Sequence, residues 1–136
     1  MPAIVWTEEF SVGVESLDAQ HRRLFDVVNE LDEAIEKLRG QRAMTRVLRE
    51  LVGYTQEHFA FEERLLAEAE YPDLADHQAK HRAIIQKIER FEYELNVEKQ
   101  RISREVRDFL QHWLLTHVAE EDKAYVPALA GRSVGA

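Results

Sequence analysis

The chain has 136 residues, a hydrophobic fraction of 45% and a formal net charge of −8. This length suits one domain, and the hydrophobic content permits a real core, which argues against a disordered chain. The negative charge argues against nucleic acid or an anionic membrane as a partner, and the absence of cysteine excludes disulfides, iron–sulfur clusters and thiolate zinc sites.

Residues 1–17 contain the apolar side chains Trp6, Phe10, Val12 and Val14 but no helical period. We expect an extended arm that packs on the rest of the protein. The arm also lacks a basic region followed by an apolar run, so no secretory signal is expected. No run of about 18 apolar residues occurs anywhere, so we expect no transmembrane helix and a cytoplasmic location.

Next come two segments in which apolar residues alternate three and four positions apart, the pattern of an amphipathic helix. We expect the first helix over about residues 18–38, with Asp18 as its N-cap and Gly40 ending it. The second is expected over about 41–68. It contains Gly53, which costs about 1 kcal/mol relative to alanine but does not end the helix.

Two more helices are expected after a turn at Tyr71-Pro72-Asp73. The third covers about residues 74–97. The fourth covers about 103–126, capped by Ser103 and ending before Pro127.

The short connections favour antiparallel neighbours, so we predict an all-α fold, an up-down-up-down four-helix bundle forming a single domain over 1–136. In that topology, the starts of the first and third helices meet the ends of the second and fourth. Polar residues on the inward seams fall at this end: His21, His58, Glu62, His77, His81 and His117.

Their spacing suits metal binding. His58 and Glu62 are four residues apart, as are His77 and His81, so each pair projects from one helical face. One such pair alone is as easily two surface histidines. Together with histidines from the other two helices, the pairs predict a metal site, because burying polar groups without partners costs a few kcal/mol each.

The second carboxylate is open on spacing alone. Asp122 lies five residues after His117 and on a regular helix points about 140° away from it. Glu121, four residues after His117, is better aligned and slightly preferred. Asp122 reaches the site only if the helix loosens, for example through one π-turn, a feature often found at functional sites.

Taken in order, His21, His58-x-x-x-Glu62, His77-x-x-x-His81 and His117-x-x-x-x-Asp122 resemble the hemerythrin family, and more closely its single-domain bacterial members. The arm sequence Trp6…Phe10-Ser11-Val12-Gly13-Val14 and the stretch Leu17-Asp18-Ala19-Gln20-His21 look like that family too. The resemblance spans about residues 4–126, and it implies Asp122 rather than Glu121 as the second carboxylate.

The resemblance implies a cofactor of two iron ions, a non-haem di-iron centre with an oxo or hydroxo bridge. His77, His81 and His117 would bind one iron and His21 and His58 the other, with Glu62 and Asp122 bridging. Counting donors leaves one coordination position free on the second iron. The implied function is reversible dioxygen binding at that position, for oxygen carriage, storage or delivery in the cell, and not an enzymatic reaction.

The resemblance also implies a dry oxygen pocket, whose apolar walls match Trp113, Leu114 and Val118. Phe25 and Phe59 lie close to ligands in the sequence and are further candidates. The alternative is that these side chains simply pack the core. Tyr125 matches a family tyrosine that can donate a hydrogen bond to a bridging carboxylate, and a plain interface tyrosine is the alternative. His112 matches no ligand and is expected to be solvated.

Other functions stay open at this point. The same site could sense oxygen, scavenge nitric oxide, or act as a di-iron peroxidase or oxidase. Dedicated sensing is disfavoured because no output domain is fused to the bundle. Besides dioxygen, we expect an unidentified reductant or oxygen-consuming partner, and a monomer. Oxygen affinity and autoxidation rate do not follow from the sequence.

Overall fold

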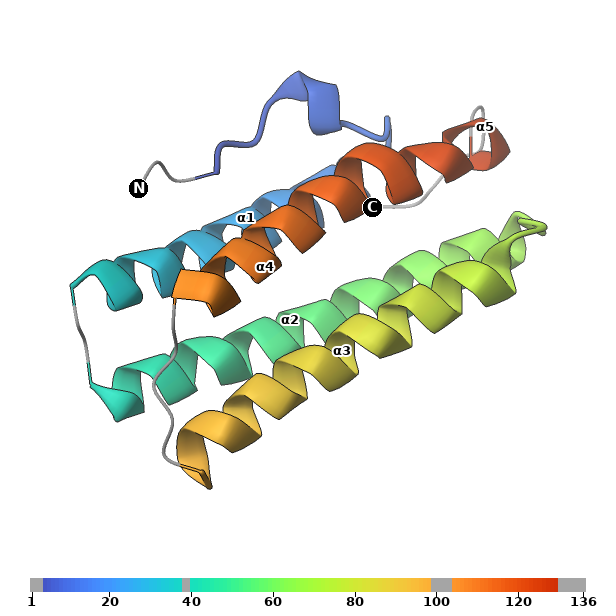
Figure 1. Cartoon of the computed structure of the whole chain (residues 1–136). Coiled ribbons are helices and arrows are strands. Elements are labelled where there is room, and N and C mark those ends of the chain that lie inside the picture. The colour runs from blue at the N-terminus through green and yellow to red at the C-terminus, as the bar shows by residue number, and fades with distance from the viewer. Residues whose placement is uncertain (1–3, 38–39, 99–103, 130–136) are drawn as a thin grey trace.

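The computed structural model describes residues 4–37, 40–98 and 104–129. Four long helices dominate these residues, listed in chain order: α1 (Glu15–Glu36), α2 (Gln41–Glu68), α3 (Leu74–Asn96) and α4 (Arg104–Thr116). Successive helices run in opposite directions (Figure 1). Helix α2 packs against both α1 and α3, and α1 packs against α4. The predicted all-α up-down-up-down bundle is confirmed.

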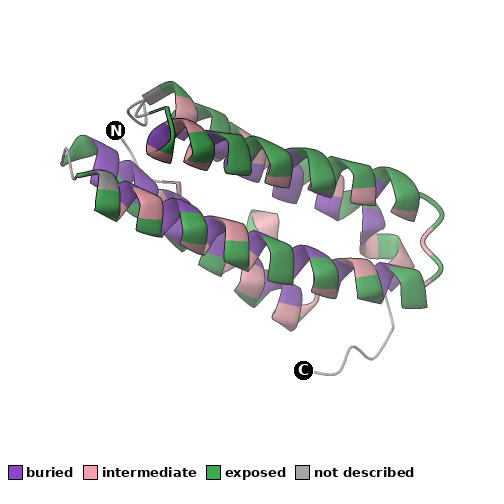
Figure 2. Cartoon of the chain, turned by 90° about the horizontal axis from the view of Figure 1, so that it is seen from below, coloured by how far each residue is buried: buried purple, intermediate pink, exposed green. Residues whose placement is uncertain are grey.

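The apolar period of each helix becomes its buried face, and the exposed positions lie on the outer side of the bundle (Figure 2). Fully burying one leucine or valine contributes about 1.5–3 kcal/mol. The main core is built from the inner faces of the four helices and includes Leu24, Val28, Leu31, Leu48, Leu51, Ile88 and Leu110. Gly53 does not interrupt α2, as predicted. Thr55 is buried in this core, where its hydroxyl donates a 2.6 Å hydrogen bond to the Leu51 carbonyl.

The arm is held to α1 by polar side chains of that helix. Helix α1 begins at Glu15 rather than 18, and a short 3₁₀ turn, η1 (Glu8–Phe10), interrupts the extended arm. The prediction that Asp18 caps the helix is wrong. Asp18 lies inside the helix, and its carboxylate accepts hydrogen bonds from the Ser11 hydroxyl (2.6 Å) and the Val12 amide (2.9 Å). The Asp18 carboxylate therefore binds the arm instead of capping the backbone of its own helix.

The loop between α1 and α2 also differs in detail from expectation. Helix α1 ends at Glu36 with Lys37 as its C-cap. Gly40 does not directly end α1. It has extended backbone and precedes the first residue of α2. Residues 38 and 39 lie outside the described part of the chain.

A tight turn connects α2 to α3. The Tyr71 amide donates to the Leu66 carbonyl (3.0 Å) and the Glu70 amide to the Ala67 carbonyl (3.1 Å), which is the hydrogen-bond pattern of a Schellman motif. Glu70 has a positive φ of 56°. This turn brings the end of α2 beside the start of α3, as the predicted turn at residues 71–73 requires.

The fourth helix changes its winding near its end. After Thr116 it continues as a π-helix, η2 (His117–Asp122), a 3₁₀ turn, η3 (Lys123–Tyr125), and a short helix, α5 (Val126–Leu129). The prediction that the helix ends before Pro127 is wrong, since Pro127 is the second residue of α5. A first-turn proline is tolerated because its missing N–H would have no partner within the helix. The predicted cap Ser103 lies outside the described residues.

None of the helices that the structure describes has the length and apolar character needed to span a bilayer.

Candidate metal centre

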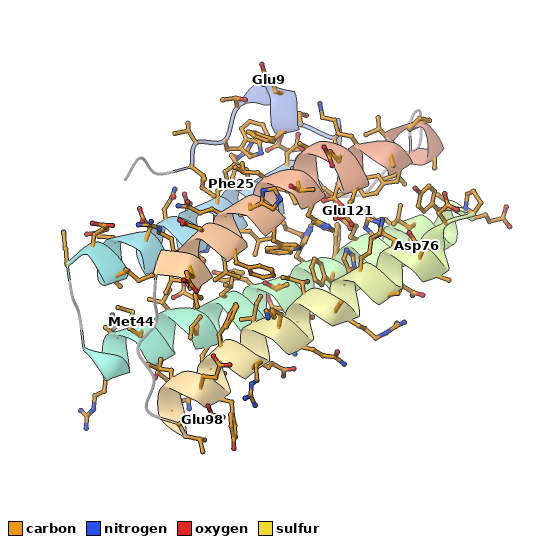
Figure 3. The ribbon with its side chains drawn as sticks, viewed as in Figure 1. Glu9, Phe25, Met44, Asp76, Glu98 and Glu121 are labelled. Carbon is orange, nitrogen blue, oxygen red and sulfur yellow. The ribbon has the colours of Figure 1, made fainter. Side chains whose placement is uncertain are left out.

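Seven polar side chains meet between the helices at one end of the bundle. They come from all four helical segments: His21 from α1, His58 and Glu62 from α2, His77 and His81 from α3, and His117 and Asp122 from η2. Each is at most 4% exposed. Figure 3 shows nitrogen- and oxygen-bearing side chains gathered between the ribbons near the labelled Glu121. The structure therefore brings together every residue predicted to bind metal.

The donor atoms form two groups that share both carboxylates. In one group, donor atoms of Glu62, His77, His81, His117 and Asp122 all lie within 4.8 Å of one another. In the other, donor atoms of His21, His58, Glu62 and Asp122 meet the same limit. Two subsites with three and two imidazoles, joined by two common carboxylates, form the arrangement expected for a pair of bridged metal ions.

The π-helix accounts for the position of Asp122. A π-helix has i→i+5 hydrogen bonds, so residues five apart lie on one face. His117 and Asp122 are the first and last residues of η2, and both point into the cluster. Glu121 lies outside both donor groups. Its Oε1 is 3.8 Å from Nδ1 of His117 and its Oε2 is 3.6 Å from Lys80. The preference for Glu121 from regular helical spacing is thus wrong about which carboxylate enters the cluster.

Several donor atoms in the cluster have no hydrogen-bond partner among the described residues. They are Nε2 of His81, Nε2 of His117 and both carboxylate oxygens of Asp122, although Nε2 of His81 lies 3.1 Å from Oε1 of Glu62 and Nε2 of His117 lies 3.1 Å from Oδ1 of Asp122. Nε2 of His21 and Nε2 of His58 face each other at 3.1 Å. Leaving a buried polar group unsatisfied costs about 1–3 kcal/mol, so this convergence of lone pairs fits metal ions better than a metal-free core.

The carboxylates strongly influence the protonation of the imidazoles. Burial raises the pKa of Glu62, but the charge of His58 and hydrogen bonds from the neighbouring histidines outweigh burial and hold that pKa well below its usual value. Burial lowers the pKa of His21 and His77, but the nearby carboxylates of Asp122 and Glu62 raise it to about 9 for His21 and about 10 for His77. Without metal, protons occupy positions that a metal ion would take, so metal binding should release protons.

Apolar rings line the cluster on its core side. The ring of Phe59 stacks on His81 with centroids 3.5 Å apart, and the ring of Trp113 stacks on His117 at 5.6 Å. Leu114 and Val118 are fully buried on either side of His117. All four side chains belong to the main core cluster or pack against it, and the Phe59 ring also lies beside His58 of the two-histidine subsite, with ring centroids 5.7 Å apart.

The remaining predicted site residues lie in different surroundings. Phe25 is buried, but its ring packs edge-on against Phe10 of the arm, with centroids 5.2 Å apart. Tyr125 is fully buried, and its hydroxyl donates a 3.0 Å hydrogen bond to Oε2 of Glu62. His112 is exposed, as expected for a histidine left out of the site.

Two contacts to the outer nitrogens of the histidines were not predicted. Oε1 of Gln20 lies 2.7 Å from Nδ1 of His58, and Oε2 of Glu63 lies 2.7 Å from Nδ1 of His81. Each contact joins different helices. Gln20 and Glu63 directly adjoin predicted ligands in the sequence, but nothing in the spacing shows which imidazole on a neighbouring helix each would meet.

Comparison with known proteins identifies the family. The family model described as "Hemerythrin HHE cation binding domain" matches residues 12–129. Bacteriohemerythrin of Stenotrophomonas maltophilia is 37% identical over 126 residues, covering 92% of this chain and 80% of that protein. Bacteriohemerythrin of Clostridium acetobutylicum is 30% identical over 129 residues, covering 90% and 98%.

An animal relative and a solved structure also match the chain. Myohemerythrin of Riftia pachyptila is 30% identical over 121 residues, with 89% of each chain covered. A crystal structure of wild-type hemerythrin superposes with a TM-score of 0.87 at 28% identity, covering 96% of this chain and all of the other. The family model, the relatives and the fold agree with the geometry of the buried cluster, and the chain belongs to the hemerythrin family.

Proposed function

We propose that the protein binds dioxygen reversibly at a di-iron centre and serves oxygen carriage, storage or delivery in the cell. The observation that carries this proposal is the pair of donor groups that share Glu62 and Asp122 but differ by one imidazole. His77, His81 and His117 would hold one iron, and His21 and His58 the other. When bound, the iron pair supplies the electrons and the open coordination position that dioxygen binding requires.

The unequal number of imidazoles decides where the ligand goes. With both carboxylates shared, the three-histidine subsite offers one more protein donor than the two-histidine subsite. An iron bound by His21 and His58 would therefore be the one with an open coordination position. Five neutral imidazoles and two carboxylates also give less negative charge than the carboxylate-rich sites of ferritin-like di-iron proteins. Such a donor set stabilises highly oxidised iron less, which favours release of dioxygen over cleavage of its O–O bond.

The surrounding side chains keep the site dry and the carboxylates in place. Phe59, Leu114 and Val118 are buried against the cluster and exclude water from it. We infer that these residues, with Trp113 and Phe25, form the pocket that protects bound dioxygen. We infer further that Tyr125 holds Glu62 through the hydrogen bond described above, which fixes the orientation of a bridging ligand.

The finer parts of this proposal concern the cellular setting. We infer that residues 1–136 form a single hemerythrin-like domain that acts as a monomer in the cytoplasm. We also infer that the protein is not an enzyme, and that a reductant or an oxygen-consuming protein is its partner. The bacteriohemerythrin relatives support this setting.

The test is an oxygen difference spectrum on iron-loaded protein. Reduced protein should develop a visible absorption band on exposure to oxygen and lose it when oxygen is removed under vacuum, over repeated cycles. Irreversible oxidation within seconds would contradict reversible binding. Sustained turnover of peroxide with a reductant would instead indicate a peroxidase, and elemental analysis should return two irons per chain, one for each donor group.

A further inference from the structure

The two subsites differ in the hydrogen-bond partners of the imidazole nitrogens (Nδ1) that face away from the cluster. At the two-histidine subsite, Nδ1 of His58 faces the neutral amide oxygen of Gln20 at 2.7 Å. Nδ1 of His21 has no hydrogen-bond partner among the described residues. At the three-histidine subsite, Nδ1 of His81 faces the Glu63 carboxylate at 2.7 Å. An anionic acceptor thus stands directly behind one subsite and a neutral acceptor behind the other.

The charge of Glu63 is directed at His81. Its side chain is 25% exposed, and within the described ranges it forms no ion pair with a lysine or arginine. Glu121 also approaches the three-histidine subsite, but its contact to His117 is 3.8 Å long and Lys80 lies 3.6 Å from its other oxygen. Glu63 is therefore the stronger source of negative charge behind this subsite.

We propose that Glu63 is a positioning residue that makes the two metal subsites unequal beyond their difference in histidine number. By accepting the Nδ1–H of His81, Glu63 holds the tautomer that presents Nε2 to the metal. Its charge makes that imidazole a stronger donor. Gln20 holds His58 in the same tautomer without adding charge. Loss of such an outer partner typically weakens metal binding about 10- to 100-fold. This inference rests on the proposed di-iron function.

The test uses Co²⁺ as a probe of metal-free protein, because Co²⁺ reports affinity without oxygen chemistry. Wild-type protein should take up two Co²⁺ in two steps, the tighter at the three-histidine subsite. Glu63→Gln, which keeps an acceptor but removes the charge, should weaken the tighter step about 10- to 100-fold and leave the weaker step unchanged. Gln20→Glu should strengthen the weaker step. Because Gln20→Glu adds a negative charge at the two-histidine subsite and leaves Glu63 unchanged, this variant tests the inference even if the Glu63 variants fold poorly.

A second readout separates positioning from charge. In the Co²⁺ form, the Nδ1–H protons of bound histidines give shifted, exchangeable proton NMR signals. The His81 signal should persist in Glu63→Gln, because the amide oxygen still accepts the hydrogen bond. It should be lost to rapid solvent exchange in Glu63→Ala. A merely structural role for Glu63 would not produce this difference between the two variants.

The matched control is Glu57→Gln, which removes one exposed negative charge on α2 beside His58. It should leave both Co²⁺ steps unchanged. The inference is overturned if Glu63→Gln leaves the tighter step unchanged, if it weakens both steps equally, or if Glu57→Gln has the same effect. Failure of wild-type protein to bind two metal ions would instead overturn the proposed function.

Discussion

The Tyr125 hydroxyl donates a 3.0 Å hydrogen bond to Oε2 of Glu62, and both side chains are fully buried. Tyr125 belongs to the 3₁₀ turn that follows the π-helix, and Glu62 belongs to α2. The bond therefore ties the end of the fourth helix to a carboxylate shared by both subsites.

Removing this hydroxyl should destabilise the protein. In Tyr125→Phe, the Glu62 oxygen loses a buried donor, and we expect the free energy of unfolding to fall by about 1–3 kcal/mol. Urea denaturation of metal-free protein measures the change. Tyr93→Phe is the matched control, because Tyr93 is 46% exposed and should lose almost nothing. Equal effects of the two substitutions would show that the buried hydrogen bond does not contribute to the free energy of unfolding.

The sequence predicts the bundle well because its apolar period is simple and its connections are short. Four inward seams and antiparallel packing suffice to place the five histidines and Glu62 at one end. Asp122 is different, since a regular helix directs Glu121 inward instead. The position of Asp122 depends on the π-helix His117–Asp122, which the spacing of apolar residues does not predict. Only the family resemblance indicates Asp122.

Other details depend on tertiary contacts that a single sequence does not display. Asp18 looked like a helix cap, but it binds the arm through Ser11 and Val12. Gln20 and Glu63 hold imidazoles on neighbouring helices, and that choice is set by how the helices rotate against each other. Helix α1 begins at Glu15 instead of 18 and α5 ends at Leu129 instead of 126, but the ligand residues still meet at the predicted end of the bundle.

Removing the metal should lower the melting temperature markedly. The cluster holds the ligand atoms of His81, His117 and Asp122 buried in the folded state, and metal ions that bind only the folded state stabilise it. Thermal unfolding followed by circular dichroism, before and after anaerobic chelation, measures the difference. Adding back Fe²⁺ should restore the original value. Equal melting temperatures would argue that these side chains are not ligands.

The metal-free protein should also lose stability as the pH rises. The folded-state pKa is about 9 for His21 and about 10 for His77, both above the ordinary value of 6.5. The stabilisation from these imidazoles is fully present below about pH 6.5 and is lost as the pH passes through about 9 and 10. Urea denaturation across this range should therefore show a falling midpoint. Metal-loaded protein is the comparison, since its bound imidazoles carry no such proton and its midpoint should change less. A rising midpoint in the metal-free protein would contradict the assigned protonation.

His58→Ala should remove one iron more readily than the other. His58 belongs to the donor group that has only two imidazoles, so that subsite would keep one. We expect iron content to fall from about two per chain to about one, together with loss of the oxygen-dependent absorption band. His112→Ala is the matched control because His112 is an exposed histidine outside the cluster. Normal iron content in His58→Ala would show that the assignment of this subsite is wrong.

Glu70→Gly should stabilise the turn that places α2 beside α3 at the metal-binding end. Glu70 has a φ of 56°, in the left-handed region that costs about 1–2 kcal/mol for residues other than glycine. Glycine is the usual residue at this point of a Schellman motif, so relief of strain should exceed its greater chain entropy. We expect the free energy of unfolding to rise by up to about 1 kcal/mol in urea denaturation. Ala60→Gly, at an exposed position inside α2, should lower it by about 1 kcal/mol. Destabilisation by both substitutions would show that the Glu70 side chain contributes more than its backbone strain costs.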